Sequence, residues 1–328
     1  MTIGSSSCGM HSYTLHLNGY GESWGFKQDY AFEKKIDLYQ MMDLAVEWGL
    51  DVLHITLVDL DNDVSAEHLA EVSAAARSRD LELELNVSIN APCDPRVDAS
   101  VEAALHIGHA IGAPLLKFSL DIERPKPIYG SCMHPDVVVQ LADRLREFQK
   151  NIPLIEKYGM KIALENHCDL FADEVIWVVE QLHHPLIGAC LDTMNSLVLM
   201  EGIEECVKKM APYAYCCHFC DIEIVVDADG THSIGTAIGQ GDIDCVKLIQ
   251  ELRANAPQAL DTIIFEIELP MNGRPIEEGR ELELRATKES IDYMRNVLNV
   301  GLKQCGGDIV RWDAHLRTGQ TVTTSPVP

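Results

Sequence analysis

The sequence has few aromatic residues and no excess of basic ones. Only 6% of its 328 residues are Phe, Trp or Tyr, and 26 Lys and Arg face 51 Asp and Glu, which gives a formal net charge of −25. Binding to DNA or RNA depends on Lys and Arg that neutralise phosphates, so we expect no nucleic-acid partner. Small polar molecules and divalent cations suit an acidic chain better.

Long apolar runs and paired cysteines are also missing. No window approaches the roughly 18 apolar residues of a membrane-spanning helix, so we expect no membrane partner. The first residues show neither the basic nor the apolar region of a signal peptide. Eleven cysteines, an odd number scattered through apolar segments, do not fit a small disulfide scaffold. We therefore expect a cytoplasmic protein with reduced thiols.

Short apolar, β-branched runs recur along the chain and predict eight strands. They lie at 9–15, 51–57, 82–88, 115–121, 161–167, 187–193, 215–221 and 262–269. Between them, apolar residues three and four positions apart predict helices, the last at 287–303. Three of these helices end at Gly49, Gly112 and Gly159, just before the next strand.

Eight alternating strands and helices predict an α/β fold of the (β/α)8 TIM barrel type. A doubly wound sheet is the competing architecture, but no glycine-rich fingerprint follows the first predicted strand. We expect one barrel domain over residues 1–304. Residues 305–328 are rich in Gly, Thr, Ser and Pro without periodicity, and we interpret them as a C-terminal tail.

The segment KIALENHCD, residues 161–169, raises the question of function. It runs from an apolar strand directly into Glu165, Asn166 and His167. In a TIM barrel the carboxyl ends of the strands carry the active site. The ends of predicted strands five to eight supply Glu165, Asp192, His218 and Glu266. Three carboxylates and one imidazole suit Mn²⁺, Mg²⁺, Fe²⁺ or Co²⁺, and also Zn²⁺, so we predict a divalent metal site.

The motifs ALENH, CLDTMNS, HFCD, GQGDID and FEIE, in this order, resemble the strand-end motifs of the xylose isomerase-like TIM barrel superfamily. Its members include sugar isomerases and epimerases, ketose 3-epimerases, inosose dehydratases and the endonuclease IV group. The resemblance covers roughly residues 10–300 and implies that Glu165, Asp192, His218 and Glu266 bind the metal. Glu268 is the alternative to Glu266, because FEIE offers two carboxylates of the same strand parity.

The resemblance implies a divalent-metal-dependent enzyme that acts on a sugar or keto-sugar by proton abstraction next to a polarised carbonyl. We expect Glu165 and Glu266 to act as the acid–base pair of an isomerase or epimerase. Asp192 and His218 would hold the cation, with Asp221 orienting His218.

Several further residues are candidates for contact with substrate. His134 lies in the long loop after predicted strand four, a place suited to a substrate wall, and is a candidate general acid or base. His167 has the strand parity of Glu165, and the alternative for it is a hydrogen bond within the loop. Asn195 stands where ketose epimerases place a substrate-binding His. Lys117, His11 and Trp24 complete the candidate set, although strand parity alone does not decide where Lys117 points.

Two alternatives stay open on the sequence. The chain also resembles the large subunit of C-glycoside deglycosidases, which implies a lyase that cleaves 3-oxo-glycosides by β-elimination, with bound Mn²⁺ and a small partner subunit. Mn²⁺ is therefore the metal we expect first, and the chain would form a homo-oligomer or pair with a small subunit. A scaffold barrel without activity is the other alternative, which the complete ligand set argues against.

Overall fold

The computed structural model describes residues 1–7, 36–89, 95–269, 275–305 and 308–311. Its centre is a closed barrel of eight parallel strands in the order β1-β10-β7-β6-β5-β4-β3-β2. These strands are β1 (Thr2–Ser6), β2 (Val52–Thr56), β3 (Glu82–Ser88), β4 (Leu115–Ser119), β5 (Lys161–Glu165), β6 (Ile187–Asp192), β7 (Ala214–Phe219) and β10 (Thr262–Phe265). The predicted (β/α)8 barrel is confirmed.

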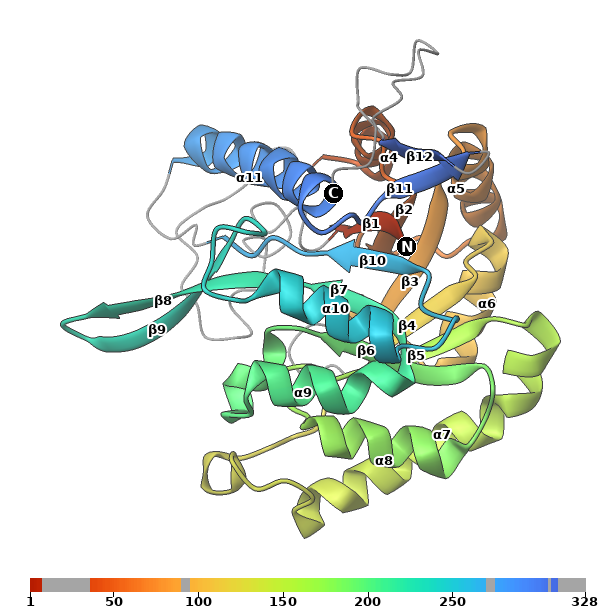
Figure 1. Cartoon of the computed structure of the whole chain (residues 1–328). Helices are drawn as coiled ribbons and strands as arrows, with labels where there is room; N and C mark the ends of the chain where they lie inside the picture. Colours follow the sequence, from red (N-terminus) through yellow and green to blue (C-terminus); the bar gives the residue numbers. More distant parts are fainter. Residues whose placement is uncertain (8–35, 90–94, 270–274, 306–307, 312–328) are drawn as a thin grey trace.

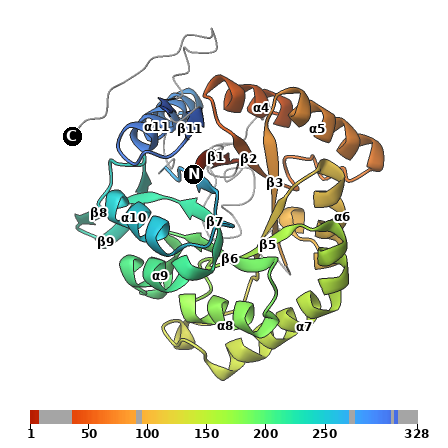
Figure 2. The same cartoon turned by 45° about the vertical axis from the view of Figure 1, so that its right-hand side comes forward.

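Helices surround the barrel, as the second view shows (Figure 2). They are α4 (Leu38–Glu47), α5 (Ala66–Ser78), α6 (Val101–Ile111), α7 (Pro135–Tyr158), α8 (Ala172–Leu182), α9 (Ile203–Met210), α10 (Cys245–Asn255) and α11 (Ile276–Asn296). Short 3-10 turns cover Pro95–Val97, Lys126–Ile128, Asn195–Leu199 and Ala211–Tyr213. Gly49, Gly112 and Gly159 all have positive φ, as their predicted place at helix ends requires. Among the described helices, none has the length and apolar character to cross a bilayer.

Two hairpins extend this plan. β8 (Asp221–Asp227) and β9 (Gly230–Thr236) pair antiparallel and project from the barrel between β7 and α10 (Figure 1). β11 (Leu302–Cys305) and β12 (Asp308–Arg311) pair antiparallel where the tail was predicted to begin. Most of the predicted tail lies outside the described residues.

The first strand was predicted wrongly. Residues 2–6, not 9–15, complete the barrel by pairing with β10 and β2, and 9–15 lies outside the described residues. Thr2–Ser6 is short and, apart from Ile3, built of small residues, so it lacks the apolar run that identifies a strand in sequence. Position 4 in this strand has no room for a side chain. A Cβ on Gly4 would lie 2.6 Å from Ile264 Cδ1 and 2.8 Å from Val52 Cβ.

The last helix was also misplaced, since α11 spans 276–296 rather than 287–303. Its first half is highly charged and shows little apolar periodicity. Acidic residues in its first turn, Glu277 and Glu278, favour a helix start there through the helix dipole.

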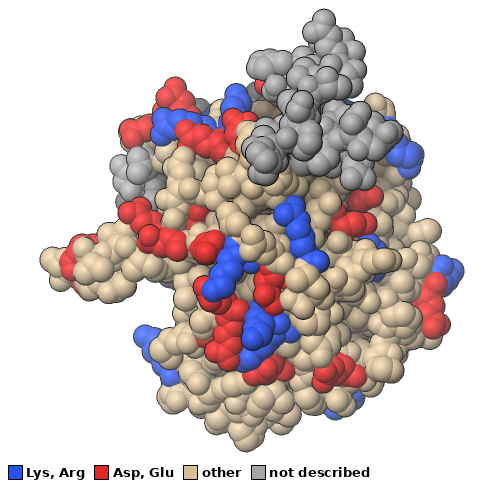
Figure 3. All heavy atoms as spheres, in the orientation of Figure 1, with Lys and Arg blue, Asp and Glu red and all other residues tan. Residues whose placement is uncertain are grey.

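The surface charges are largely balanced on the face shown in Figure 3. Lys and Arg side chains there lie beside Asp and Glu, over the region where Figure 1 shows α9 and α10. Lys209 Nζ lies 3.0 Å from Asp173 Oδ2, and Lys247 Nζ lies 2.5 Å from Glu204 Oε2. These basic side chains pair with acids instead of forming a separate basic patch.

The position of β1 can be tested by replacing Gly4. Gly4→Ala should lower the free energy of unfolding by about 1–3 kcal/mol, because the added methyl overpacks the barrel interior. Gly202→Ala is the matched control, since its Cβ would meet nothing within 4 Å and its φ is −66°. Urea unfolding followed by circular dichroism measures both. Equal stabilities of the two variants would contradict the assignment of β1.

Candidate metal centre

Two layers of side chains fill the inside of the barrel. The inner apolar layer consists of Val52, Leu115, Ala163, Cys190, Cys216 and Ile264, a cluster separate from the main core between the barrel and the helices. Two positions later on each of these strands comes a buried polar residue, and these form the polar layer: His54, Lys117, Glu165, Asp192, His218 and Glu266. Because side chains alternate along a strand, residues two apart point to the same side. The polar layer therefore lies on top of the apolar layer, toward the carboxyl ends of the strands.

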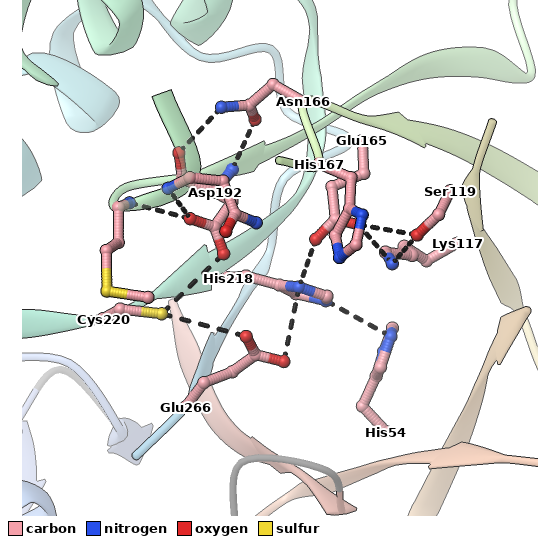
Figure 4. A network of polar contacts seen from close by, with 12 residues as sticks. His54, Lys117, Ser119, Glu165, Asn166, His167, Asp192, His218, Cys220 and Glu266 are labelled. Carbon is pink, nitrogen blue, oxygen red and sulfur yellow. Dashed lines mark hydrogen bonds and ion pairs between the residues drawn. The ribbon is translucent and has the colours of Figure 1, made fainter. Parts of the chain in front are cut away.

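The four predicted metal ligands all belong to the polar layer and converge (Figure 4). One ligand atom each from Asp192, His218 and Glu266 lies within 4.8 Å of the others. Nδ1 of His218 lies 2.9 Å from Oε1 of Glu165 and 3.4 Å from Oε1 of Glu266. Glu165 and Asp192 end β5 and β6, while Glu266 directly follows β10.

Lys117 lies inside the barrel, with its ammonium in contact with Glu165. Ser119 Oγ donates a hydrogen bond to the same oxygen, Glu165 Oε2, at 2.9 Å, and accepts one from Lys117 Nζ at 2.7 Å. Burial alone would raise the pKa of Glu165, but the charges of Lys117 and His218 hold it well below its usual value. Glu165 thus stays ionised, with Oε1 free to face the other ligands.

Asp192 is fixed by its own loop and by Asn166. Its Oδ1 accepts hydrogen bonds at 2.7 Å from the backbone N–H groups of Met194 and Asn195. The Asn166 amide bonds both backbone groups of Asp192, accepting from its N–H at 2.7 Å and donating to its carbonyl at 3.0 Å. Burial, together with the charges of Glu266 and Glu165, raises the pKa of Asp192 to about 7.

The charges of the polar layer fit a divalent cation. Burial lowers the pKa of His54 despite its hydrogen bond to Glu84, so His54 is neutral. Glu165, Asp192 and Glu266 lie around Lys117 and His218, and despite burial the Cys190 thiol and the charges of Glu266 and Glu165 raise the pKa of His218 well above its usual value. A divalent cation that displaced the His218 proton would supply the positive charge that these buried carboxylates need. Glu165, Asp192, His218 and Glu266 would hold it.

The remaining predicted residues are placed around this centre. His167 lies in the loop after β5, where its Nδ1 is 3.7 Å from Oδ1 of Asp169. The Asn195 side chain is buried and accepts a hydrogen bond from the Cys168 thiol at 3.1 Å. Glu268, the alternative ligand, is exposed, and the cluster of possible ligand atoms includes Glu266 instead.

His134 lies at the N-terminus of α7 instead of within the ligand cluster. Its Nδ1 accepts a hydrogen bond from the Asp136 backbone at 3.2 Å, so it caps the helix. Its loop is anchored by Arg124, which bonds Glu174 Oε2 at 2.5 Å and the Ser131 carbonyl at 2.8 Å. His11 and Trp24 lie outside the described residues.

Asp221 does not have the position expected for it. Its carboxylate accepts hydrogen bonds from the backbone N–H groups of Gly239 and Gly241, at 2.8 and 2.9 Å. A Cβ on Gly241 would lie 2.3 Å from Asp221 Oδ1. Asp221 therefore holds the loop before α10, and the expectation that it orients His218 was wrong.

The sequence reasoning missed His54, Glu84 and Ser119, which also lie among these buried polar groups. His54 and Glu84 lie within β2 and β3, away from predicted strands five to eight that supplied the ligands, and Ser119 is the last residue of β4. A signal was available, because a charged or imidazole side chain inside a short apolar strand is costly unless it meets a partner.

The contribution of Asn166 to the site can be measured directly. Asn166→Ala leaves the buried N–H and carbonyl of Asp192 without partners, so it should lower the free energy of unfolding by about 2–4 kcal/mol. Asn255→Ala on α10 is the control, because that amide is exposed and should cost less than about 0.5 kcal/mol. Chemical denaturation of both variants measures the two losses of stability, and equal losses would contradict the role of Asn166 in holding Asp192.

Comparisons with known proteins agree with this architecture. A family model described as xylose isomerase-like TIM barrel matches residues 42–297. A 3-oxo-isoapionate decarboxylase of Pectobacterium atrosepticum is 25% identical over 178 residues, which are 54% of this chain. The match covers 62% of that relative, less than two thirds of its length.

Solved structures show the same fold at low identity. D-psicose 3-epimerase of Clostridium cellulolyticum H10, solved with D-tagatose, has a TM-score of 0.63 and 16% identity, covering 91% of this chain and 99% of that one. The IOLI protein with a bound zinc atom has a TM-score of 0.61 and 15% identity, covering 89% and 98%. Since the family model alone spans most of the barrel, the chain belongs to the xylose isomerase-like TIM barrel family.

Proposed function

We propose that this protein is a divalent-metal-dependent enzyme that removes a proton next to the carbonyl of a sugar or keto-sugar, as an isomerase or epimerase does. The observation that carries the proposal is the polar layer, in which the three carboxylates of Glu165, Asp192 and Glu266 meet the imidazole of His218 in a buried site. The bound zinc of one structural neighbour and the sugar of another support a metal and a carbohydrate as ligands. Mn²⁺ is the cation proposed first, with Mg²⁺, Co²⁺, Fe²⁺ and Zn²⁺ as the others to test.

The bound cation would polarise the substrate carbonyl and acidify the neighbouring C–H. Within the chain, Glu165 suits the role of a ligand that stays ionised, because Lys117 and Ser119 engage its Oε2. Glu266 also faces Nδ1 of His218, and among the described residues its Oε2 is contacted by the weak Cys220 thiol, at 3.8 Å. Of the expected acid–base pair, Glu266 is therefore the better proton acceptor, and Glu165 the better ligand.

A second class of reaction would use the same metal-polarised ketone to stabilise an enolate, formed by loss of CO₂ or by proton removal before β-elimination. The relative at 25% identity is named a 3-oxo-isoapionate decarboxylase, so a 3-oxo sugar acid is a substrate class to test. Cleavage of a 3-oxo-glycoside by β-elimination is the related lyase reaction. Release of CO₂ or of an aglycone would favour these over isomerisation, and epimerised product would exclude them as the main activity.

The cation site is tested by calorimetric titration with MnCl₂ after chelation. The parent protein should bind one Mn²⁺ per chain, and Asp192→Asn should lose more than the 10–100-fold in affinity typical of residues that only support a ligand. Asp229→Asn, at an exposed turn of the β8–β9 hairpin, should bind as the parent does. A parent that binds no divalent cation, or an Asp192→Asn variant that binds equally well, would refute the site.

Proton transfer is tested by exchange of C–H for C–D in D₂O, followed by NMR with ketohexoses as substrates. At saturating Mn²⁺, Glu266→Gln should slow exchange by about 10²–10⁴-fold, the usual contribution of a general base. Glu102→Gln, on the exposed side of α6, is the control. Unchanged exchange in Glu266→Gln would remove this residue from proton transfer.

A further inference from the structure

A chain of buried contacts runs from His218 away from the other ligands. Nε2 of His218 lies 3.3 Å from Nε2 of His54, and Nδ1 of His54 lies 2.9 Å from Oε2 of Glu84. The two imidazole rings meet edge to face, with centroids 4.9 Å apart and an angle of 87° between their planes. His54 and Glu84 face each other in register on β2 and β3, and all three side chains are buried (Figure 4 shows the two histidines).

The positions of the protons in this series of contacts follow from the acceptor at its end, the Glu84 carboxylate. Nδ1 of His54 faces a carboxylate oxygen of Glu84, which is an acceptor, so the ring donates there and carries its proton on Nδ1. Nε2 of His54 is then an acceptor, and the hydrogen bond between the two rings requires a proton on Nε2 of His218. An imidazole that binds a cation carries one proton, so with that proton on Nε2 the Nδ1 atom of His218 is left for the cation. Nδ1 is the atom that faces Glu165 and Glu266.

We propose that His54 and Glu84 are positioning residues that fix the tautomer and the ring orientation of His218, so that its Nδ1 is ready for the cation. This inference rests on the cation site proposed above and adds two residues that touch neither cation nor substrate. It follows the general pattern in which the second ring nitrogen of a metal-binding histidine determines its tautomer.

One other arrangement of the same atoms has to be separated from this one. His54, Cys216 and His218 also offer ligand atoms within 4.8 Å of one another. If His54 were itself a ligand, the protein would bind a second cation at these residues. If His54 is a positioning residue, binding stops at one cation per chain.

The experiment compares two substitutions at one position. His54→Leu removes the acceptor for His218 Nε2–H and should weaken Mn²⁺ binding by about 10–100-fold in calorimetric titration. His54→Gln places an amide oxygen near the position of the lost Nε2 and should restore most of that loss. His232→Leu, on the exposed β9 strand, should bind like the parent protein. Thermal unfolding of each variant checks the fold.

An NMR measurement on the parent protein does not depend on the stability of any variant. With ¹⁵N-labelled histidine and diamagnetic Zn²⁺ bound, His218 should show a proton on Nε2 and a bound Nδ1, and His54 should show its proton on Nδ1. The opposite tautomers, a second cation lost in His54→Leu, or parental affinity in His54→Leu would each overturn the inference. Failure of the parent to bind any cation would instead refute the proposed site itself.

Discussion

The site depends on the burial of three carboxylates beside Lys117 and His218 in the interior of a barrel. Glu165, Asp192 and Glu266 are all at most 8% exposed, and Lys117 is the ammonium among them. A buried charge without a partner costs several kcal/mol, so side chains of like sign do not gather in this way without compensation. Burial raises the pKa of Asp192 to about 7, and the charges of Glu266 and Glu165 add to the rise. A divalent cation bound there would relieve the repulsion and supply the chemistry that we propose.

The architecture of the barrel makes this gathering possible. Each strand contributes one apolar residue to the lower layer and a polar one two positions later, so the repulsive groups rest on a packed floor. The floor excludes water from below, which strengthens the electrostatic interactions above it. The supporting groups come from different strands: Lys117 and Ser119 from β4 orient Glu165, and Asn166 from the end of β5 holds Asp192. Lys117 and Ser119 contact the Glu165 oxygen that faces away from the other ligands, and Asn166 bonds the backbone of Asp192.

Much of this could be predicted from the sequence, and the failures have physical causes. The repeated strand and helix pattern predicted the fold, and the strand-end motifs predicted the four residues that meet in the polar layer. Thr2–Ser6 was missed because its partners across the barrel require small side chains, which give no apolar signal. The β8–β9 hairpin was not predicted, because most of its residues are exposed and it lacks the buried apolar run by which strands were identified. His54 and Glu84 were missed because their significance lies in the pairing of β2 with β3, and register is a property of three-dimensional structure.

Lys117 and Asp221 show the same limit. Strand parity left two directions for Lys117, and only the register of β4 with β5 brings its ammonium to Glu165. Asp221 follows His218 closely in sequence, yet the start of the hairpin turns its carboxylate to the loop at 239–243. Proximity in sequence predicted a partner there that the backbone path excludes.

The central claim is that four side chains of the polar layer bind one cation. Anomalous diffraction at the manganese edge, from crystals grown with MnCl₂, tests it most directly. The account predicts one strong peak between Glu165, Asp192, Nδ1 of His218 and Glu266. A map with no peak at these atoms, or with its main peak elsewhere in the barrel, would contradict it.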